Sequence, residues 1–177
     1  MVARWIYDLA KTRKDAEFEL LDLRDYPLPF FNEKGSPQSL NDEIPVAKKW
    51  RDKVSQADGY IIVSPEYNHG YPAVLKNALD YTYKPWNDKP VGFVSYGSVG
   101  GARAIEQLRL VSIELQMAPI ETSIGLMKIR EIFDENGKMK DDAYSKRVEG
   151  LLDNLILWAD ALLKIRSKSS EGIEGTE

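Results

Sequence analysis

Short runs of apolar residues alternate with segments of helical periodicity along this chain, and this alternation restricts the fold more than any other feature. Residues 59–64 and 91–96 are nearly uninterrupted apolar runs with β-branched members, which are typical of strands buried on both faces of a parallel sheet. Residues 18–23 and 119–124 predict two further strands. Because strands that alternate with helices form parallel sheets covered on both faces, the sequence predicts an α/β fold of three layers, α-β-α.

Helical periodicity begins with the first residues, whereas open doubly wound folds usually begin with a strand. The first predicted helix carries apolar residues at helical spacing, namely Val2, Trp5, Ile6, Leu9 and Ala10. Further helices are predicted over residues 46–57, 72–81, 102–117 and 141–165. We expect a turn or hairpin near residues 133–137. Residues 1–166 are predicted to form one domain and residues 167–177 a disordered tail.

The composition excludes several classes of protein. The sequence has no cysteine, so disulfides, cysteine-ligated iron–sulfur clusters and thiol nucleophiles are impossible. One histidine is too few for the usual structural zinc sites, and we predict no metal site. A net charge of −4 disfavours nucleic-acid binding, and no apolar run approaches the roughly 20 residues of a membrane span. We therefore expect a cytoplasmic protein with neither a nucleic-acid nor a membrane partner.

Two loops that leave the predicted strands carry the residues best suited to bind a ligand, because ligands of open α/β sheets bind beyond the carboxyl ends of the strands. Residues 64–70 combine a proline, an aromatic ring and an amide, which suit the face and edge of a planar heteroaromatic ligand. Residues 95–101 have small side chains before a predicted helix, where backbone N–H groups favour acceptors. Both segments are equally compatible with ordinary connecting loops.

These segments resemble the NADPH-dependent FMN reductase family. The resemblance is carried by Ser64-Pro65-Glu66-Tyr67-Asn68 with Pro72, Leu75-Lys76-Asn77-Ala78 and Asp80, and by Pro27-Leu28-Pro29 and Tyr96-Gly97-Ser98 with Gly100-Gly101. It extends from the first helix to about Leu163. That family has the flavodoxin-like fold and includes quinone, azo-dye and chromate reductases. The resemblance therefore implies a flavodoxin-like sheet and an FMN-dependent NAD(P)H oxidoreductase.

The resemblance also implies the residues that contact the cofactor. The isoalloxazine ring of FMN would lie along Pro65, Glu66, Tyr67 and Asn68. The pyrimidine end of the ring would accept hydrogen bonds from the backbone of Ser95, Tyr96, Gly97, Ser98 and Gly100. NADPH would pass hydride to flavin N5, and the electrons would go on to free flavin, a quinone or a similar small acceptor. Because the cofactor supplies this chemistry, no side chain is predicted to be catalytic. The family further implies a homodimer or homotetramer.

One feature of the family is not found in the sequence. The family's first strand ends in a Gly-Ser-x-Arg type loop that wraps the FMN phosphate, whereas this sequence opens with the helix that would follow that loop. The strand would occupy the centre of a sheet with the order 2-1-3-4-5. We therefore expect the first strand to be missing from this chain and the chain to bind FMN poorly. The alternatives are a non-catalytic or cofactor-free flavodoxin-like domain and a flavodoxin-like electron carrier.

Two side chains near the loops have open roles. His69, the only histidine, is either a proton donor to a quinone, a contact to the flavin edge, or a solvated loop residue. Arg103 begins the helix after the glycines and is either a contact to an NADPH phosphate or a solvated helix residue.

Overall fold

The centre of the molecule is a parallel sheet. The computed structural model describes residues 1–39 and 44–171, and its sheet has three strands in the order β1-β2-β3. The strands are β1 (Tyr60–Pro65), β2 (Pro90–Tyr96) and β3 (Ala118–Leu126), and both neighbouring pairs are parallel. The predicted α/β class and parallel sheet are confirmed. β3 extends beyond the predicted strand at both ends.

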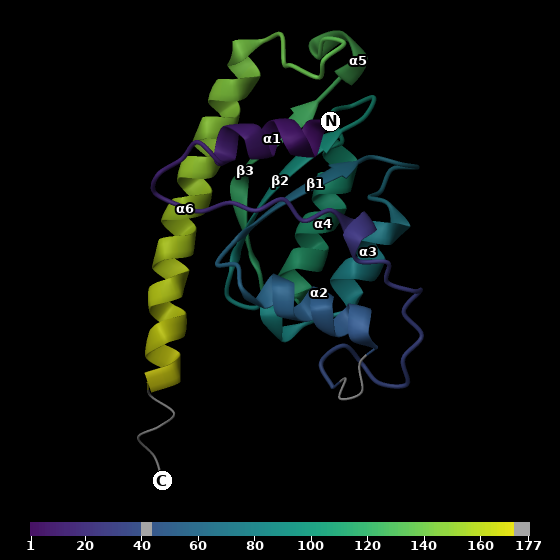
Figure 1. The fold of residues 1–177 in the computed structure, drawn as a ribbon, viewed down its shortest axis with the longest axis vertical. Helices are drawn as coiled ribbons and strands as arrows, with labels where there is room; N and C mark the ends of the chain where they lie inside the picture. Colours follow the sequence, from purple (N-terminus) through teal and green to yellow (C-terminus); the bar gives the residue numbers. More distant parts are fainter. Residues whose placement is uncertain (40–43, 172–177) are drawn as a thin grey trace.

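Helices connect the strands and flank them (Figure 1). They are α1 (Val2–Ala10), α2 (Pro45–Ser55), α3 (Ala73–Asp80), α4 (Ala102–Glu114), the short α5 (Ile129–Ile132) and α6 (Asp142–Glu171), with 3₁₀ turns η1 (Leu23–Asp25) and η2 (Lys84–Trp86). The predicted opening helix is confirmed. In the described part of the chain, no helix has the length and hydrophobicity that crossing a bilayer requires.

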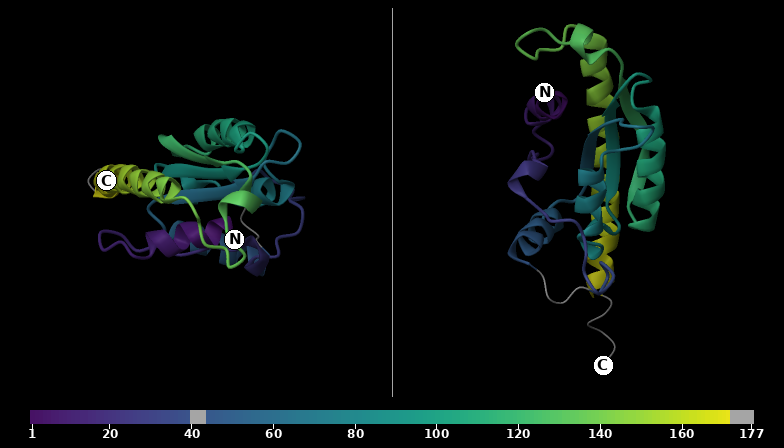
Figure 2. Two further views of the ribbon diagram at one scale, coloured as in Figure 1. Left: turned by 90° about the horizontal axis from the view of Figure 1, so that it is seen from above. Right: turned by 90° about the vertical axis from the view of Figure 1, so that its right-hand side faces the viewer.

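Two apolar clusters hold the helices on the sheet. One joins α2, α3 and α4 to Phe93, and the other joins α1 and α6 to Val94. Phe93 and Val94 are both fully buried, and successive strand residues point to opposite faces of a sheet. Figure 2 accordingly shows α1 and α4 on opposite sides of the strands. This arrangement confirms the flavodoxin-like layering that the sequence predicted.

The predicted strand at residues 18–23 is wrong. Residues 17–22 have no regular secondary structure, and Leu23 begins η1. A strand needs a partner for its backbone groups, and the only strand paired with β1 in the described sheet is β2. The apolar side chains of the segment are still used, because Phe18 packs against one core cluster and Leu21 against the other.

The end of the chain also differs from the prediction. α6 continues to Glu171, so residues 167–171 are helical rather than disordered, and residues 172–177 of the predicted tail lie outside the described residues. The predicted turn near residues 133–137 is present. An isolated antiparallel bridge joins Phe133 to Met139, and the Asp134 carboxylate accepts hydrogen bonds from the N–H groups of Asn136 and Lys138.

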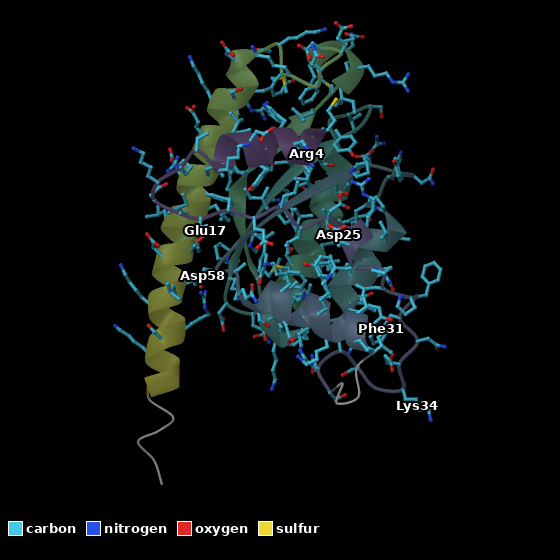
Figure 3. All side chains as sticks on the ribbon, viewed as in Figure 1. Arg4, Glu17, Asp25, Phe31, Lys34 and Asp58 are labelled. Atoms are coloured by element: carbon cyan, nitrogen blue, oxygen red, sulfur yellow. The ribbon has the colours of Figure 1, made fainter. Side chains whose placement is uncertain are left out.

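Lys89 is a buried cation directly before β2, with only 7% of its surface exposed. Its Nζ donates to the Ser55 carbonyl at 3.1 Å and to the Tyr60 hydroxyl at 3.2 Å. Burial, together with the positive charge of Arg166, lowers the pKa of Lys89 to about 8, and Asp58 opposes this shift. Figure 3 shows Asp58 beside α6, where its carboxylate accepts from Arg166 at 2.5 Å.

We predict that Lys89 makes the stability of the fold rise with pH in alkaline solution. Because its pKa is lowered to about 8 in the folded state from 10.5, the unfolded chain binds the proton more tightly between these values, and folding is penalised at lower pH. As the pH rises through this window, the free energy of unfolding of the native protein should therefore increase relative to that of Lys89→Met by up to about 1 kcal/mol per pH unit. Denaturant titrations at several pH values measure this, with Lys84→Met, at an exposed lysine, as the control. Parallel pH dependences of native protein and Lys89→Met would contradict the prediction.

Candidate functional site

Two loops lie side by side at the carboxyl ends of β1 and β2, at the upper end of the sheet in Figure 1. Pro65 at the end of β1 is in register with Tyr96 at the end of β2. One residue further on, the N–H of Glu66 donates to the Tyr96 carbonyl at 2.8 Å. The structure therefore brings the two predicted groups of site residues, 65–68 and 95–100, together at one edge of the sheet.

The first loop is a tight turn that presents Tyr67. The backbones of Tyr67 and Gly70 exchange hydrogen bonds of 2.8 and 2.9 Å. Asn68 and His69 between them have φ values of 50° and 67°, as in a type I′ turn, and both residue types tolerate this region. Tyr67 is 63% exposed, so its side chain is accessible beside the second loop.

The second loop is pressed against the sheet by its glycines. Gly100 and Gly101 have φ values of 70° and 76°, which favour glycine. A Cβ on Gly101 would lie 1.9 Å from Ser95 Oγ, and a Cβ on Gly125 of β3 would lie 2.9 Å from the Gly100 carbonyl oxygen. The tip at Ser98 and Val99 is exposed, and within the described chain the backbone N–H groups of these two residues donate to no protein acceptor.

The side chain of Ser95 points into the protein. It is fully buried, and its Oγ donates to the Ser64 carbonyl at 2.8 Å. The Ser64 hydroxyl, also buried, donates to the Pro65 carbonyl at 2.9 Å. The Ser95 hydroxyl therefore joins the end of β2 to the end of β1, whereas the Ser64 hydroxyl bonds within β1.

The Glu66 side chain is also turned inward, toward α4. It is 4% exposed, and its Oε1 lies 2.7 Å from Arg103 Nε. Its Oε2 accepts from the backbone N–H of Arg103 at 3.0 Å. The carboxylate thus occupies the positive N-terminus of α4, where anions are favoured.

The same contacts define the surroundings of His69 and Arg103. Arg103 Nη1 lies 2.5 Å from His69 Nε2, and Gln107 Nε2 donates to the His69 carbonyl at 2.8 Å. The charge of Arg103 is therefore directed to Glu66 and His69, and neither Arg103 nor His69 is a simply solvated residue. Gln107 was not predicted from the sequence, although it lies one helical turn after Arg103 on the same face of α4.

Tyr96 completes the group as a half-buried ring. Burial raises the pKa of its hydroxyl, and the phenolate charge of Tyr67 adds to the rise. Its hydroxyl is therefore protonated at neutral pH and can donate a hydrogen bond. Gly97, which follows, lies close to the first loop, because a Cβ there would be 3.1 Å from Glu66 Cβ.

Gly125 is a further residue that the sequence analysis missed. It lies within β3 and lets the loop at Gly100 approach the strand. An isolated glycine in a strand often marks such an approach, so the sequence contained a signal. Two shallow surface cavities, of about 540 and 430 Å³, lie instead beside α1 and α2 and are lined by none of the predicted site residues.

A flavodoxin-like α/β fold is the class that this sheet and its loops define. The solved structure of FerB, a flavoenzyme NAD(P)H:(acceptor) oxidoreductase from Paracoccus denitrificans, superposes with a TM-score of 0.74 over 91% of each chain. An NADH:FMN oxidoreductase in its apo form superposes with a TM-score of 0.59 over 87% of this chain and 78% of that one. Their identities of 22% and 18% establish the shared fold alone.

The family follows from the sequence comparisons. The profile of the family described as NADPH-dependent FMN reductase matches residues 1–129. An NAD(P)H-dependent FMN reductase of Schizosaccharomyces pombe is 39% identical over 129 residues, which cover 71% of this chain and 64% of the relative. A 2-hydroxy-1,4-benzoquinone reductase of a Burkholderia species is 31% identical over 153 residues, or 81% of this chain and 80% of the relative. This chain belongs to the NADPH-dependent FMN reductase family.

The chain spans less than two thirds of the length of some of its relatives. The share is 64% for the Schizosaccharomyces pombe protein and 60% for an NAD(P)H-dependent FMN reductase of a Nectria species. For the NADH:(hydroxy)cinnamate reductase subunit CrdA of Vibrio ruber, which is 35% identical, the matched region covers 77% of that protein and 86% of this chain.

We predict that Gly101→Ala destabilises the protein by at least about 2 kcal/mol, because the added Cβ meets Ser95 and the backbone is left-handed. Gly150→Ala is the matched control. Gly150 lies in α6 with open space around it, so the change should stabilise the helix by about 0.5–1 kcal/mol. Denaturant unfolding measures both values. Equal effects of the two substitutions would show that the loop does not need this glycine.

Proposed function

We propose that this protein is an FMN-dependent NAD(P)H oxidoreductase that passes electrons to free flavin, a quinone or a similar small acceptor. The observation that carries the proposal is the hydrogen bond from Glu66 N–H to the Tyr96 carbonyl. This bond holds the exposed side chain of Tyr67 next to the loop whose N–H groups at Ser98 and Val99 are free to bind a ligand. The chain belongs to the FMN reductase family, so a flavin is the ligand that we infer. The relatives named as quinone reductases, from Burkholderia and from Arabidopsis thaliana, support a quinone as one acceptor.

The residues present fit a flavin ring. Tyr67 offers an exposed flat face, and Ser98 and Val99 offer unused N–H groups that suit the carbonyl-rich edge of the ring. Along the ring we place the segment Pro65, Glu66, Tyr67 and Asn68, and at its polar end the backbone of Ser95, Tyr96, Gly97, Ser98 and Gly100. Glu66 and Ser95 contribute through their backbones, since their side chains are buried.

FMN, when bound, supplies the redox chemistry by accepting hydride from NAD(P)H. The tasks of the protein are then to orient the two rings and to limit the access of water. Glu66, His69 and Arg103 are engaged with one another, so none of them is assigned as an acid or base. The protonated Tyr96 hydroxyl is a neutral donor that would not repel electron-rich ligands.

We further propose that the protein works as a homodimer or homotetramer in the cytoplasm. Leu110 and Ile113 are large exposed apolar side chains one turn apart on α4, and apolar residues of this kind are enriched in the centre of homodimer interfaces. Leu110 follows Gln107 by three residues on the same helix face. A dimer seam at α4 would therefore adjoin the proposed flavin site.

We expect the purified protein to bind FMN and riboflavin only weakly, and to consume NADPH when FMN or a benzoquinone is added. Tyr67→Ala should raise the dissociation constant of both flavins roughly tenfold, because stacking of a ring on an aromatic side chain contributes about 1–3 kcal/mol. Trp158→Ala, which removes an exposed aromatic ring from α6, should leave both constants unchanged. Quenching of flavin fluorescence and loss of NADPH absorbance measure these effects. Absence of flavin binding and of NADPH consumption would favour the non-catalytic alternative.

We also expect the native protein to have at least the mass of a dimer in light scattering at micromolar concentration. The double variant Leu110→Asp with Ile113→Asp should be monomeric, because two buried charges without partners oppose association. Leu157→Asp, at an exposed leucine of α6, is the control and should retain the native mass. A monomeric native protein would contradict the assembly without affecting the proposed chemistry.

A further inference from the structure

Four contacts attach the turn at Tyr67–Gly70, together with Glu66 before it, to one face of α4. Glu66, directly before the turn, pairs with the guanidinium of Arg103 and accepts from its backbone N–H. Arg103 Nη1 also lies 2.5 Å from His69 Nε2. Gln107 Nε2 donates to the His69 carbonyl at 2.8 Å. Arg103 and Gln107 are separated by four residues, so both contacts come from the same side of the helix.

These contacts are more than the turn itself needs. The backbone bonds between Tyr67 and Gly70 already close the turn, so the Glu66 carboxylate is not needed to close it. A carboxylate that is 4% exposed is costly to bury unless charged and polar partners compensate for its lost hydration. In the part of the chain that the structure describes, Arg103 in the first turn of α4 provides this compensation, and its contacts fix the Tyr67–Gly70 turn relative to that helix.

The same helix also fixes the second loop, because α4 follows directly from Gly100 and Gly101. The contacts of Glu66 with Arg103 therefore fix the position of the Tyr67–Gly70 turn relative to the loop at 97–101. A hydrogen bond from Glu66 N–H to the Tyr96 carbonyl makes the second connection between the same two loops. The backbone N–H of Glu66 bonds to Tyr96 of β2, and its side chain bonds to Arg103 of α4. Glu66 is therefore the residue common to both connections.

We propose that Glu66 is a positioning residue, whose buried carboxylate sets the separation between the Tyr67 turn and the loop at 97–101 and so preorganises the seat of the flavin ring. The identity of the ligand in this inference rests on the proposed function. The positioning of the two loops by Glu66 rests on the contacts described above. The side chain acts through Arg103 and does not touch the reacting atoms.

The test uses Glu66→Gln, which keeps the size of the side chain and removes its charge. Glutamine keeps one acceptor oxygen, but its amide N–H groups cannot pair with the guanidinium of Arg103. Glu106→Gln is the matched control, since Glu106 is an exposed glutamate in the same helix. Amide hydrogen exchange in the full chain without ligand reports on the device independently of any activity.

The expected result is local. In Glu66→Gln the amides of Tyr67, Gly70 and Arg103 should exchange at least about tenfold faster, while those of β2 and β3 keep their native rates. Riboflavin, used as the probe, should bind about fivefold or more weakly to this variant, because a less ordered seat costs affinity. Glu106→Gln should match the native protein in both measurements.

A double variant separates positioning through Arg103 from a loss of stability alone. Arg103→Gln should reproduce the fast exchange of the turn. Glu66→Gln combined with Arg103→Gln should be no worse than either single change, since the two residues act as one unit. Strictly additive effects on exchange and on riboflavin binding would overturn the proposal.

The remaining outcomes distinguish this inference from the proposed function. Unchanged exchange at the turn in Glu66→Gln, or a uniform acceleration across the whole sheet, overturns the positioning role even if riboflavin binds tightly. Selective acceleration at the turn supports the positioning role. If in that case neither the native protein nor the variant binds riboflavin, the device stands and the proposed function fails.

Discussion

The pairing of β1 with β2 is the constraint on which the rest of the site depends. The two strands are parallel from Tyr60 and Val91 to Pro65 and Tyr96, so the loops that follow them leave the sheet at the same edge. Glu66 N–H continues the ladder one residue beyond the strand. A shift of one residue in this register would send each side chain to the opposite face. The side chains of Glu66 and Tyr67 would then each point to the face opposite the one they now occupy.

Several buried polar groups under the loops meet a partner of this chain. Ser95 donates to the Ser64 carbonyl, Ser64 donates to the Pro65 carbonyl, and Glu66 meets Arg103. Such networks in a low-dielectric interior make a single arrangement favourable. These contacts lie within the chain and hold the loops in place, so binding needs to order little more than the ligand and the exposed side chains.

The parts of the fold that the sequence predicted well are those with a local signal. β1 and β2 are short apolar runs, and α1 and α4 have apolar residues at helical spacing. Residues 18–23 have an equally good local pattern. They are not a strand, because they pair with no strand of the described sheet. The loops at 65–68 and 95–100 were predicted at the correct edge. The inward direction of Glu66 and Ser95 was not, because it depends on Arg103 and Ser64, which lie elsewhere along the chain.

α6 is the longest element, with 30 residues, and at 1.5 Å per residue it extends about 45 Å. It runs away from the loops, so its last turns lie at the opposite end of the molecule (Figure 1). Arg166 near this end donates to the Asp88 carbonyl and to Asp58. Tethering the protein to an electrode or resin through the residues after Glu171 would therefore leave the edge with Tyr67 directed to the solution, where small acceptors diffuse.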